Sequence, residues 1–243
     1  MRAGGALTTD LPLRLDEPRY QAAVDELVER ARSLGATDLV DAERQAVEMV
    51  EAAARHREHQ RLVVGESWLA TCPRRFAEAD LDTLDQPPTV LGPLRAWADR
   101  ARVGTGDNLV LVGPVGTGKT YTAVAVAREL HFAGQPMRFV PAAELLEGLR
   151  PDGGDEVAAA VGPAILVLDD LGAERPTEWT ADRLSLVLNR RWLDRSSTIV
   201  TTNLAGPALA ELYGPRLHSR LADAATSLIL GGPDRRRRPG GGA

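Results

Sequence analysis

Residues 109–120 read LVLVGPVGTGKT. The apolar run Leu109–Val112 is followed by a segment, Gly113 to Thr120, that fits the pattern G-x-x-x-x-G-K-[ST]. Apolar residues at helical spacing then continue from Lys119 to Phe132, and Gly134 closes the helix. A strand, a glycine-rich loop and a helix in this order predict a phosphate-binding loop at the carboxyl end of a parallel strand.

The residue types of this loop suit a nucleotide. Glycines let backbone N–H groups curl around phosphate oxygens, and the following helix offers its unpaired N–H groups. Lys119 is the one lysine among 29 basic residues, and it falls in frame to reach the β- and γ-phosphates. The Thr120 hydroxyl is a predicted ligand of Mg²⁺. The predicted nucleotide-binding residues are Gly113, Pro114, Val115, Gly116, Thr117, Gly118, Lys119, Thr120 and Tyr121.

A second motif ends an apolar strand in two carboxylates. Residues 164–168 are fully apolar and lead into Asp169 and Asp170. Two carboxylates at the end of a buried strand are costly unless a charge compensates them, and Mg²⁺ bound to a nucleotide does so. We expect Asp169 to face the metal and Asp170 to orient and polarise the attacking water.

Strands and helices alternate from residue 109 onward, with further strands predicted at 137–140 and 197–201 and further helices at 142–149 and 180–194. This alternation predicts an α/β fold, a parallel sheet with helices on both faces. Asn203 follows the strand 197–201, so its amide should lie near the γ-phosphate at the carboxyl edge of the sheet.

The chain before the sheet is helical in pattern. Apolar residues predict one helix from Pro18 to Gly35 and another from Thr37 to about Arg61. We expect residues 1–64 to be a small helical module that binds a partner, 65–88 to be a linker, and 89–243 to be the nucleotide-binding domain.

Composition excludes several classes of protein. The net charge of -5 argues against a globally basic nucleic-acid coat protein, and 4% aromatic residues argue against a stacking platform for single strands. A single cysteine, Cys72, can form neither an intrachain disulfide nor a four-cysteine zinc site. The N-terminus has no signal-peptide pattern and no apolar run approaches the ~18 residues of a membrane helix, so we expect a soluble cytoplasmic protein with no membrane partner.

Four stretches in this order resemble AAA+ ATPases of the DnaC/DnaI/IstB type: GPVGTGKT, ILVLDDLGAE, TIVTTN and YGPRLHSRL. TEWTADRLSLVLNRRW and CPRRFAEADLDTL are also similar, and the resemblance covers about residues 68–236. It implies a P-loop AAA+ domain that binds ATP and Mg²⁺, with a minimal or absent helical lid.

The resemblance also implies roles for single residues. Asn203 matches sensor 1, and Arg220 matches the arginine finger that acts across a subunit interface. Arg236 matches sensor 2, with Arg235 as the alternative. Many AAA+ proteins carry Glu at the position of Asp170, so the shorter carboxylate is expected to make hydrolysis slow.

The function implied by the resemblance is a replicative helicase loader. Such a protein binds the replicative helicase and single-stranded DNA at replication initiation and self-associates into a ring or spiral that hydrolyses ATP at its subunit interfaces. Two alternatives stay open: an IstB-type transposition helper that binds duplex DNA and a transposase, and a nucleotide-gated adaptor that does not hydrolyse ATP. A P-loop kinase would need an arginine-bearing lid and a pocket for the phosphate acceptor. It is disfavoured, because the polar residues from Thr201 to Asn203 at the end of a strand are typical of a nucleotide sensor.

Overall fold

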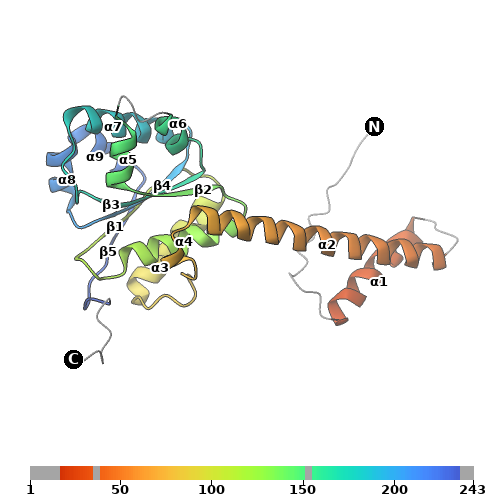
Figure 1. Ribbon diagram of the computed structural model, residues 1–243. Helices are drawn as coiled ribbons and strands as arrows, with labels where there is room; N and C mark the ends of the chain where they lie inside the picture. Colours follow the sequence, from red (N-terminus) through yellow and green to blue (C-terminus); the bar gives the residue numbers. More distant parts are fainter. Residues whose placement is uncertain (1–16, 35–38, 151–154, 236–243) are drawn as a thin grey trace. The chain divides into compact units, whose positions relative to one another are not determined.

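The computed structural model describes residues 17–34, 39–150 and 155–235. By its internal contacts the chain divides into two compact units, Met1–Gly65 and Glu66–Ala243 (Figure 1). No helix in the described ranges is long and apolar enough to cross a membrane.

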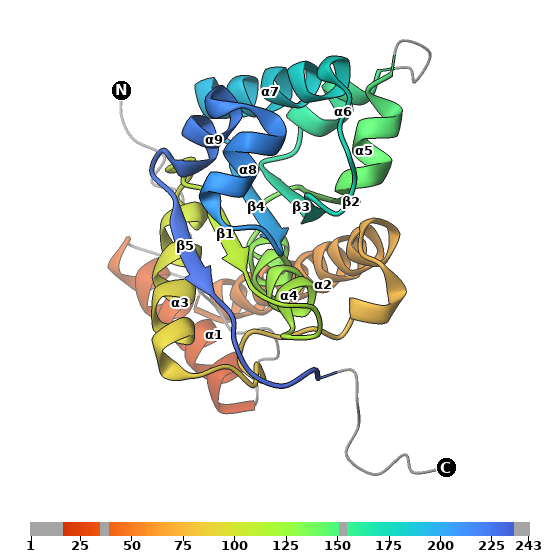
Figure 2. The ribbon, with the colours of Figure 1, turned by 90° about the vertical axis from the view of Figure 1, so that its left-hand side faces the viewer.

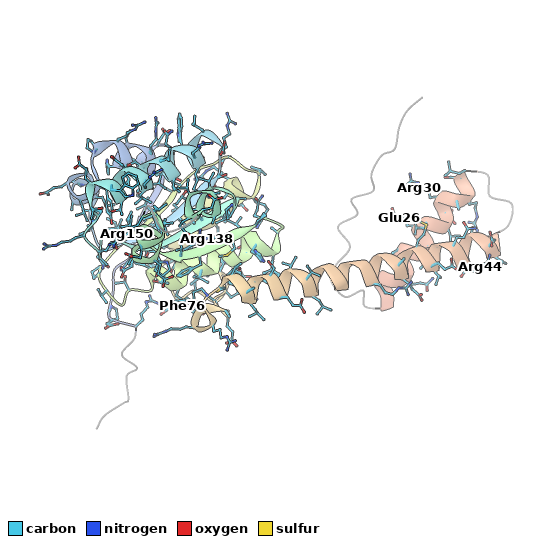
Figure 3. The ribbon with its side chains drawn as sticks, turned by 45° about the horizontal axis from the view of Figure 1, so that its top comes forward. Glu26, Arg30, Arg44, Phe76, Arg138 and Arg150 are labelled. Atoms are coloured by element: carbon cyan, nitrogen blue, oxygen red, sulfur yellow. The ribbon has the colours of Figure 1, made fainter. Side chains whose placement is uncertain are left out.

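The first unit is a helix pair. Helices α1 (Glu17–Ser33) and α2 (Leu39–Thr71) pack through a small buried cluster: Ala23, Val24, Ala46 and Val50. Figure 3 labels polar residues of this pair, Glu26 and Arg30 on α1 and Arg44 on α2. The sequence predicts both helices, but α2 continues ten residues beyond the predicted end at Arg61.

The stretch 65–88, predicted as a linker, is largely built into the second unit. Helix α2 runs through Gly65 to Thr71, and a 3₁₀ turn, η1 (Arg74–Phe76), follows. Trp68, Cys72 and Leu84 are buried in the same cluster as helices α3 (Pro88–Arg102) and α4 (Lys119–Phe132). Tertiary packing of these apolar residues therefore overrides the helix-breaking signal of the glycine and prolines.

The second unit contains a five-stranded parallel sheet in the order β2-β3-β4-β1-β5. The strands are β1 (Leu109–Val112), β2 (Met137–Pro141), β3 (Ile165–Leu171), β4 (Ser197–Thr202) and β5 (Thr226–Ile229). Strand β4 lies between β1 and β3, so the P-loop after β1, the aspartates at the end of β3 and Asn203 after β4 meet at one edge. The parallel sheet with helices on both faces is confirmed.

Alternate strand residues feed two separate cores, as the pleat requires. Leu109, Ile165 and Val167 face α3 and α4. Leu166, Leu168 and Val200 face the helices on the other side (Figures 1 and 2). Those helices are α5 (Ala142–Gly148), α6 (Glu156–Val161), α7 (Glu178–Leu193), α8 (Gly206–Tyr213) and α9 (Pro215–Ala222).

Besides the 3₁₀ turn η1, four elements are absent from the sequence prediction: α6, α8, α9 and β5. Each has eight residues or fewer and so gives only a weak periodic signal, and α8 and α9 also carry a proline at one of their first two positions. Strand β3 also extends beyond the predicted 164–168, so Asp169 and Asp170 lie within the strand.

Candidate functional site

The P-loop is held in shape by the lysine it carries. Lys119, 8% exposed at the first turn of α4, donates from Nζ to the carbonyl oxygens of Gly113 (2.8 Å) and Pro114 (2.9 Å) and to Oδ1 of Asn203 (2.7 Å). All three ammonium protons are therefore satisfied. The lysine joins the end of β1 to the end of β4, and its positive charge lies where the phosphates of a nucleotide are expected.

Asp169 is the most enclosed carboxylate of the site. Its oxygens accept hydrogen bonds from the Thr120 hydroxyl (3.2 Å) and the Thr201 hydroxyl (2.6 Å). Burial raises the pKa of Asp169 above its ordinary value, and the negative charge of Asp170 adds to this rise. The hydrogen bonds from Thr201 and Thr120 and the charge of Lys119 oppose it.

This donor set fits Mg²⁺. The ion takes hard oxygen ligands, usually one or two carboxylates together with substrate phosphates. The Thr120 hydroxyl and the Asp169 carboxylate, already within 3.2 Å of each other, are such ligands, and a divalent charge would offset the desolvation of Asp169.

Asp170 stands in a backbone conformation that few non-glycine residues adopt, with φ of 59°. Its N–H donates to the Thr201 hydroxyl (2.8 Å), and the pairing of β3 with β4 is irregular at this point. Its carboxylate lies 3.5 Å from Nδ2 of Asn203. The irregularity turns Asp170 away from the strand pattern and brings its carboxylate beside Asn203.

These groups border one cavity of about 590 Å³, a size typical of nucleotide and cofactor sites. Of the predicted site residues, the cavity is lined by Val115, Gly116, Gly118, Lys119, Thr120, Tyr121, Asp169, Asp170 and Asn203. Gly113, Pro114 and Thr117 lie behind this lining. The Thr117 hydroxyl donates to the Pro114 carbonyl (2.9 Å) and so braces the loop from within.

The sequence prediction misses one wall of the cavity. Arg75, Phe76 and the run 83–86 line it, all within the stretch predicted as a linker; Phe76 is labelled in Figure 3. Gln86 donates from Nε2 to the carbonyl of Thr117 (3.2 Å) and so attaches this wall to the P-loop. The sequence did contain a signal for this wall. Phe76, Leu81 and Leu84 are apolar residues, and a solvated linker does not need apolar residues.

The segment after β5 crosses the outer face of the P-loop. Leu230 donates from its N–H to the carbonyl of Val112 (2.7 Å), and Arg235 donates from its N–H to that of Gly116 (2.9 Å). A Cβ on Gly116 would lie 2.0 Å from a carboxylate oxygen of Asp234, so this position also needs glycine for the close approach. The Arg235 side chain lines the cavity, whereas Arg236 lies outside the described residues.

Arg220 lies elsewhere. It is in the last turn of α9, and the described residues that line the cavity do not include it. Its guanidinium contacts Asn189 and Trp192 of α7. The structure therefore brings together the predicted loop, metal and water-orienting groups of one chain, and leaves the predicted arginine finger on another face.

Comparison with known proteins identifies relatives of two kinds. The family described as IstB-like ATP binding protein matches residues 13–224. A protein of Mycobacterium tuberculosis, named as an ATP-binding protein in an insertion sequence, is 28% identical over 177 residues, 66% of this chain and 69% of its own length. The replicative helicase loader DnaI of Bacillus subtilis is 28% identical over 151 residues, 55% of this chain and 49% of its own.

Comparison of the fold with solved structures also identifies a relative of the helicase-loader kind. A crystal structure of DnaI superposes with a TM-score of 0.60 at 26% identity, covering 68% of this chain and 94% of that one. The chain spans from about half to seven-tenths of the length of the curated relatives it matches.

Proposed function

Because the chain belongs to the family of IstB-like ATP binding proteins, we propose that it is a cytoplasmic ATP hydrolase that works as a switch on DNA. The observation that carries this proposal is the cavity that the P-loop, Asp169, Asp170 and Asn203 line together. The fold is that of P-loop AAA+ ATPases.

Each side chain has a role in the proposed reaction. Lys119 holds the β- and γ-phosphates, and Thr120 and Asp169 hold Mg²⁺, which when bound neutralises phosphate charge. Asp170 accepts a proton from the water that attacks the γ-phosphoryl group, and Asn203 keeps that water in line. Of the two sensor-2 candidates we assign this role to Arg235, which lines the cavity, since Arg236 lies outside the described residues.

Arg220 completes the site from a second copy of the chain. It lies on α9 and does not line the cavity of its own chain, so in the proposed assembly it reaches the cavity of a neighbouring subunit. An arginine placed in trans stabilises charge on the transferring phosphoryl group. The protein therefore assembles into a ring or spiral, with ATP at each interface.

To identify the partner, we give more weight to the relatives from insertion sequences than to the helicase loader. The family match begins at residue 13 and so includes the N-terminal helix pair, which we propose as the partner-binding module. The proposed activity is that of a transposition helper that binds duplex DNA and a transposase. This reverses the preference drawn from sequence motifs alone.

The second candidate is a replicative helicase loader that binds single-stranded DNA and the helicase. The observation in its favour is the superposition on DnaI, which includes 94% of that chain. Both candidates use the same cavity and differ in the nucleic acid and the protein that regulate it.

Steady-state ATP turnover separates them. We expect turnover to rise with duplex DNA and transposase; a rise with single strands and replicative helicase alone would assign the loader instead. Lys119→Ala is expected to abolish ATP binding, while Arg220→Ala is expected to bind ATP and lose turnover. ATP binding without turnover in any mixture would reduce the protein to an adaptor.

The position of Arg220 in trans has its own test. Mixing Lys119→Ala, which keeps its finger, with Arg220→Ala, which keeps its cavity, should restore part of the turnover that each lacks alone. Full turnover by Arg220→Ala alone would contradict the shared site.

A further inference from the structure

Arg220 is a surface cation held in place by neutral groups. Its Nε donates to Oδ1 of Asn189 (3.1 Å), and its guanidinium carbon lies 4.1 Å from the centroid of the Trp192 ring. Within the described part of the chain no carboxylate forms an ion pair with it. The guanidinium is thus fixed in orientation while its charge stays available to an anion from outside.

The ring that supports Arg220 is itself fixed. Trp192 lies near the end of α7 and donates from Nε1 to the carboxylate of Asp223, the residue that ends α9. The Asp223 carboxylate therefore accepts from the indole N–H of Trp192, while the guanidinium of Arg220 lies over the face of the same ring. Since α7 and α9 pack against each other, the neutral side chains of Asn189 and Trp192 on α7 form a bracket around Arg220 of α9.

The backbone under Arg220 is tied to the nucleotide-binding strands. Asn108, buried just before β1, donates from Nδ2 to the carbonyl oxygens of Arg220 (3.0 Å) and Leu221 (3.4 Å). Its Oδ1 accepts from the N–H of Thr198 in β4 (3.3 Å). Strand β1 leads into the P-loop and β4 into Asn203, so the same two strands set the position of the cavity and of Arg220.

We propose that Trp192 and Asn189 are positioning residues that present Arg220 to the γ-phosphate in the cavity of a second copy of the chain. This inference rests on the proposed function, in which Arg220 acts in trans. Charge stabilisation depends on donors that are already in place when the reaction occurs. A free arginine side chain loses rotamer freedom on binding, whereas one held by a ring and an amide has already lost it.

Helix α7 supplies a matched control. Trp179, at its other end, is also partly exposed and also stacks with an arginine, Arg183, at 4.4 Å. Trp192→Leu and Trp179→Leu therefore remove the same type of side chain and the same type of contact from one helix. Each also removes an indole hydrogen bond, which Trp179 donates to the Leu149 carbonyl and Trp192 donates to the Asp223 carboxylate. Of the two rings, only that of Trp192 stacks with Arg220.

The experiment measures turnover at saturating ATP as a function of protein concentration, together with ATP affinity. Trp192→Leu should lower the plateau rate about 2- to 30-fold, the range that a lost cation–π contact implies, with ATP affinity unchanged. Trp192→Phe should be intermediate, because it keeps a weaker ring. Trp179→Leu should match the wild type.

Asn189→Asp tests the neutral character of the bracket. The aspartate can still accept from Arg220 Nε, but it brings a negative charge to the guanidinium. The proposal expects a lower plateau rate in Asn189→Asp despite an unchanged or higher melting temperature, whereas a purely structural role expects no loss of rate.

Failure of the inference and of the proposed function are distinguishable. If Arg220→Ala loses turnover but Trp192→Leu and Asn189→Asp keep it, the bracket is overturned and the finger stands. If Trp192→Leu reaches the wild-type plateau at higher protein concentration, the tryptophan is a subunit contact and not a positioning residue. If Arg220→Ala turns over at the wild-type rate, both are overturned.

Discussion

The two units of the chain differ in what their interiors hold. The second unit has an apolar core on each face of its sheet and keeps Lys119, Asp169 and Arg191 in fixed hydrogen-bonded positions between them. The first unit has a cluster of four small buried side chains, and α2 exposes Met49 and Leu62. A large core can hold charges in place. A small one leaves apolar surface that a partner can cover.

The largest loss of stability is expected from a substitution of Arg191, in the second unit. This side chain is 1% exposed and donates to five backbone carbonyls between residues 160 and 197 and to the Thr198 hydroxyl. Burial lowers its pKa to about 10, so it stays charged at neutral pH. Arg191→Met removes these buried donations and should lower the free energy of unfolding of the second unit by about 3–5 kcal/mol.

Chemical denaturation followed by tryptophan fluorescence measures this loss. Arg190→Met, at the neighbouring exposed position, is the control and should change stability by less than about 0.5 kcal/mol. Equal stability of the two variants would mean that the second unit does not depend on its buried charge.

In the first unit the next largest effect is expected at Val50, which is 3% exposed. Val50→Asp buries an unpaired carboxylate in the small cluster and should cost about 2–4 kcal/mol, enough to separate α1 from α2. Circular dichroism should show lost helix while ATP affinity stays unchanged. Met49→Asp, 59% exposed on the same helix, should leave both unchanged. A fall in ATP affinity on Val50→Asp would show that the two units are energetically coupled.

We expect the buried Asp169 carboxylate to lower the stability of the folded protein at neutral pH. Its pKa is raised by burial, so the folded protein holds this proton more tightly than the unfolded chain does. Its contribution to stability therefore falls as pH rises from the ordinary aspartate pKa through the raised one. Asp169→Asn should raise the melting temperature at neutral pH, by about 2–4 °C for each kcal/mol gained, and flatten this pH dependence.

Calorimetry between pH 4 and pH 8 provides the measurement, with Asp170→Asn as the control at a more exposed carboxylate. A lower melting temperature for Asp169→Asn at neutral pH would mean that the hydrogen bonds from Thr120 and Thr201 outweigh the cost of burial.

The sequence predicted the groups whose chemistry depends on a short local pattern. The P-loop, the two aspartates and Asn203 each lie at the carboxyl end of a strand that the sequence predicts, and parallel strands bring these ends together. The wall from Arg75 to Gln86 could not be found in this way. It reaches the cavity through a contact between Gln86 and Thr117, 31 residues apart, and non-local contacts leave no periodic signal.

The C-terminal segment shows the same limit. Leu230 and Arg235 run beside Val112 and Gly116 because β5 pairs with β1. Strand β5 reads TSLI and lacks the fully apolar run that identifies the equally short β1, LVLV. The sequence indicates only a phosphate-binding role for Gly116. The structure adds a second reason for a glycine at this position, which is the close approach of Asp234.

The smallest expected effect concerns the ion pair at the cavity mouth between Arg235 Nη1 and Asp85 Oδ2 (2.8 Å). The Asp85 side chain is 96% exposed, so Asp85→Asn should change the free energy of unfolding by less than about 0.5 kcal/mol. The same change frees Arg235, which lines the cavity, to pair with phosphate, so ATP should bind about two- to fivefold more tightly.

Isothermal titration of ATP measures this gain, and a double-mutant cycle assigns it. In an Arg235→Gln background, Asp85→Asn should have no effect on ATP affinity, because the guanidinium it releases is gone. A gain that persists in that background would come from the loss of a negative charge near the phosphates, and Arg235 would then be a brace of the P-loop and not a phosphate ligand.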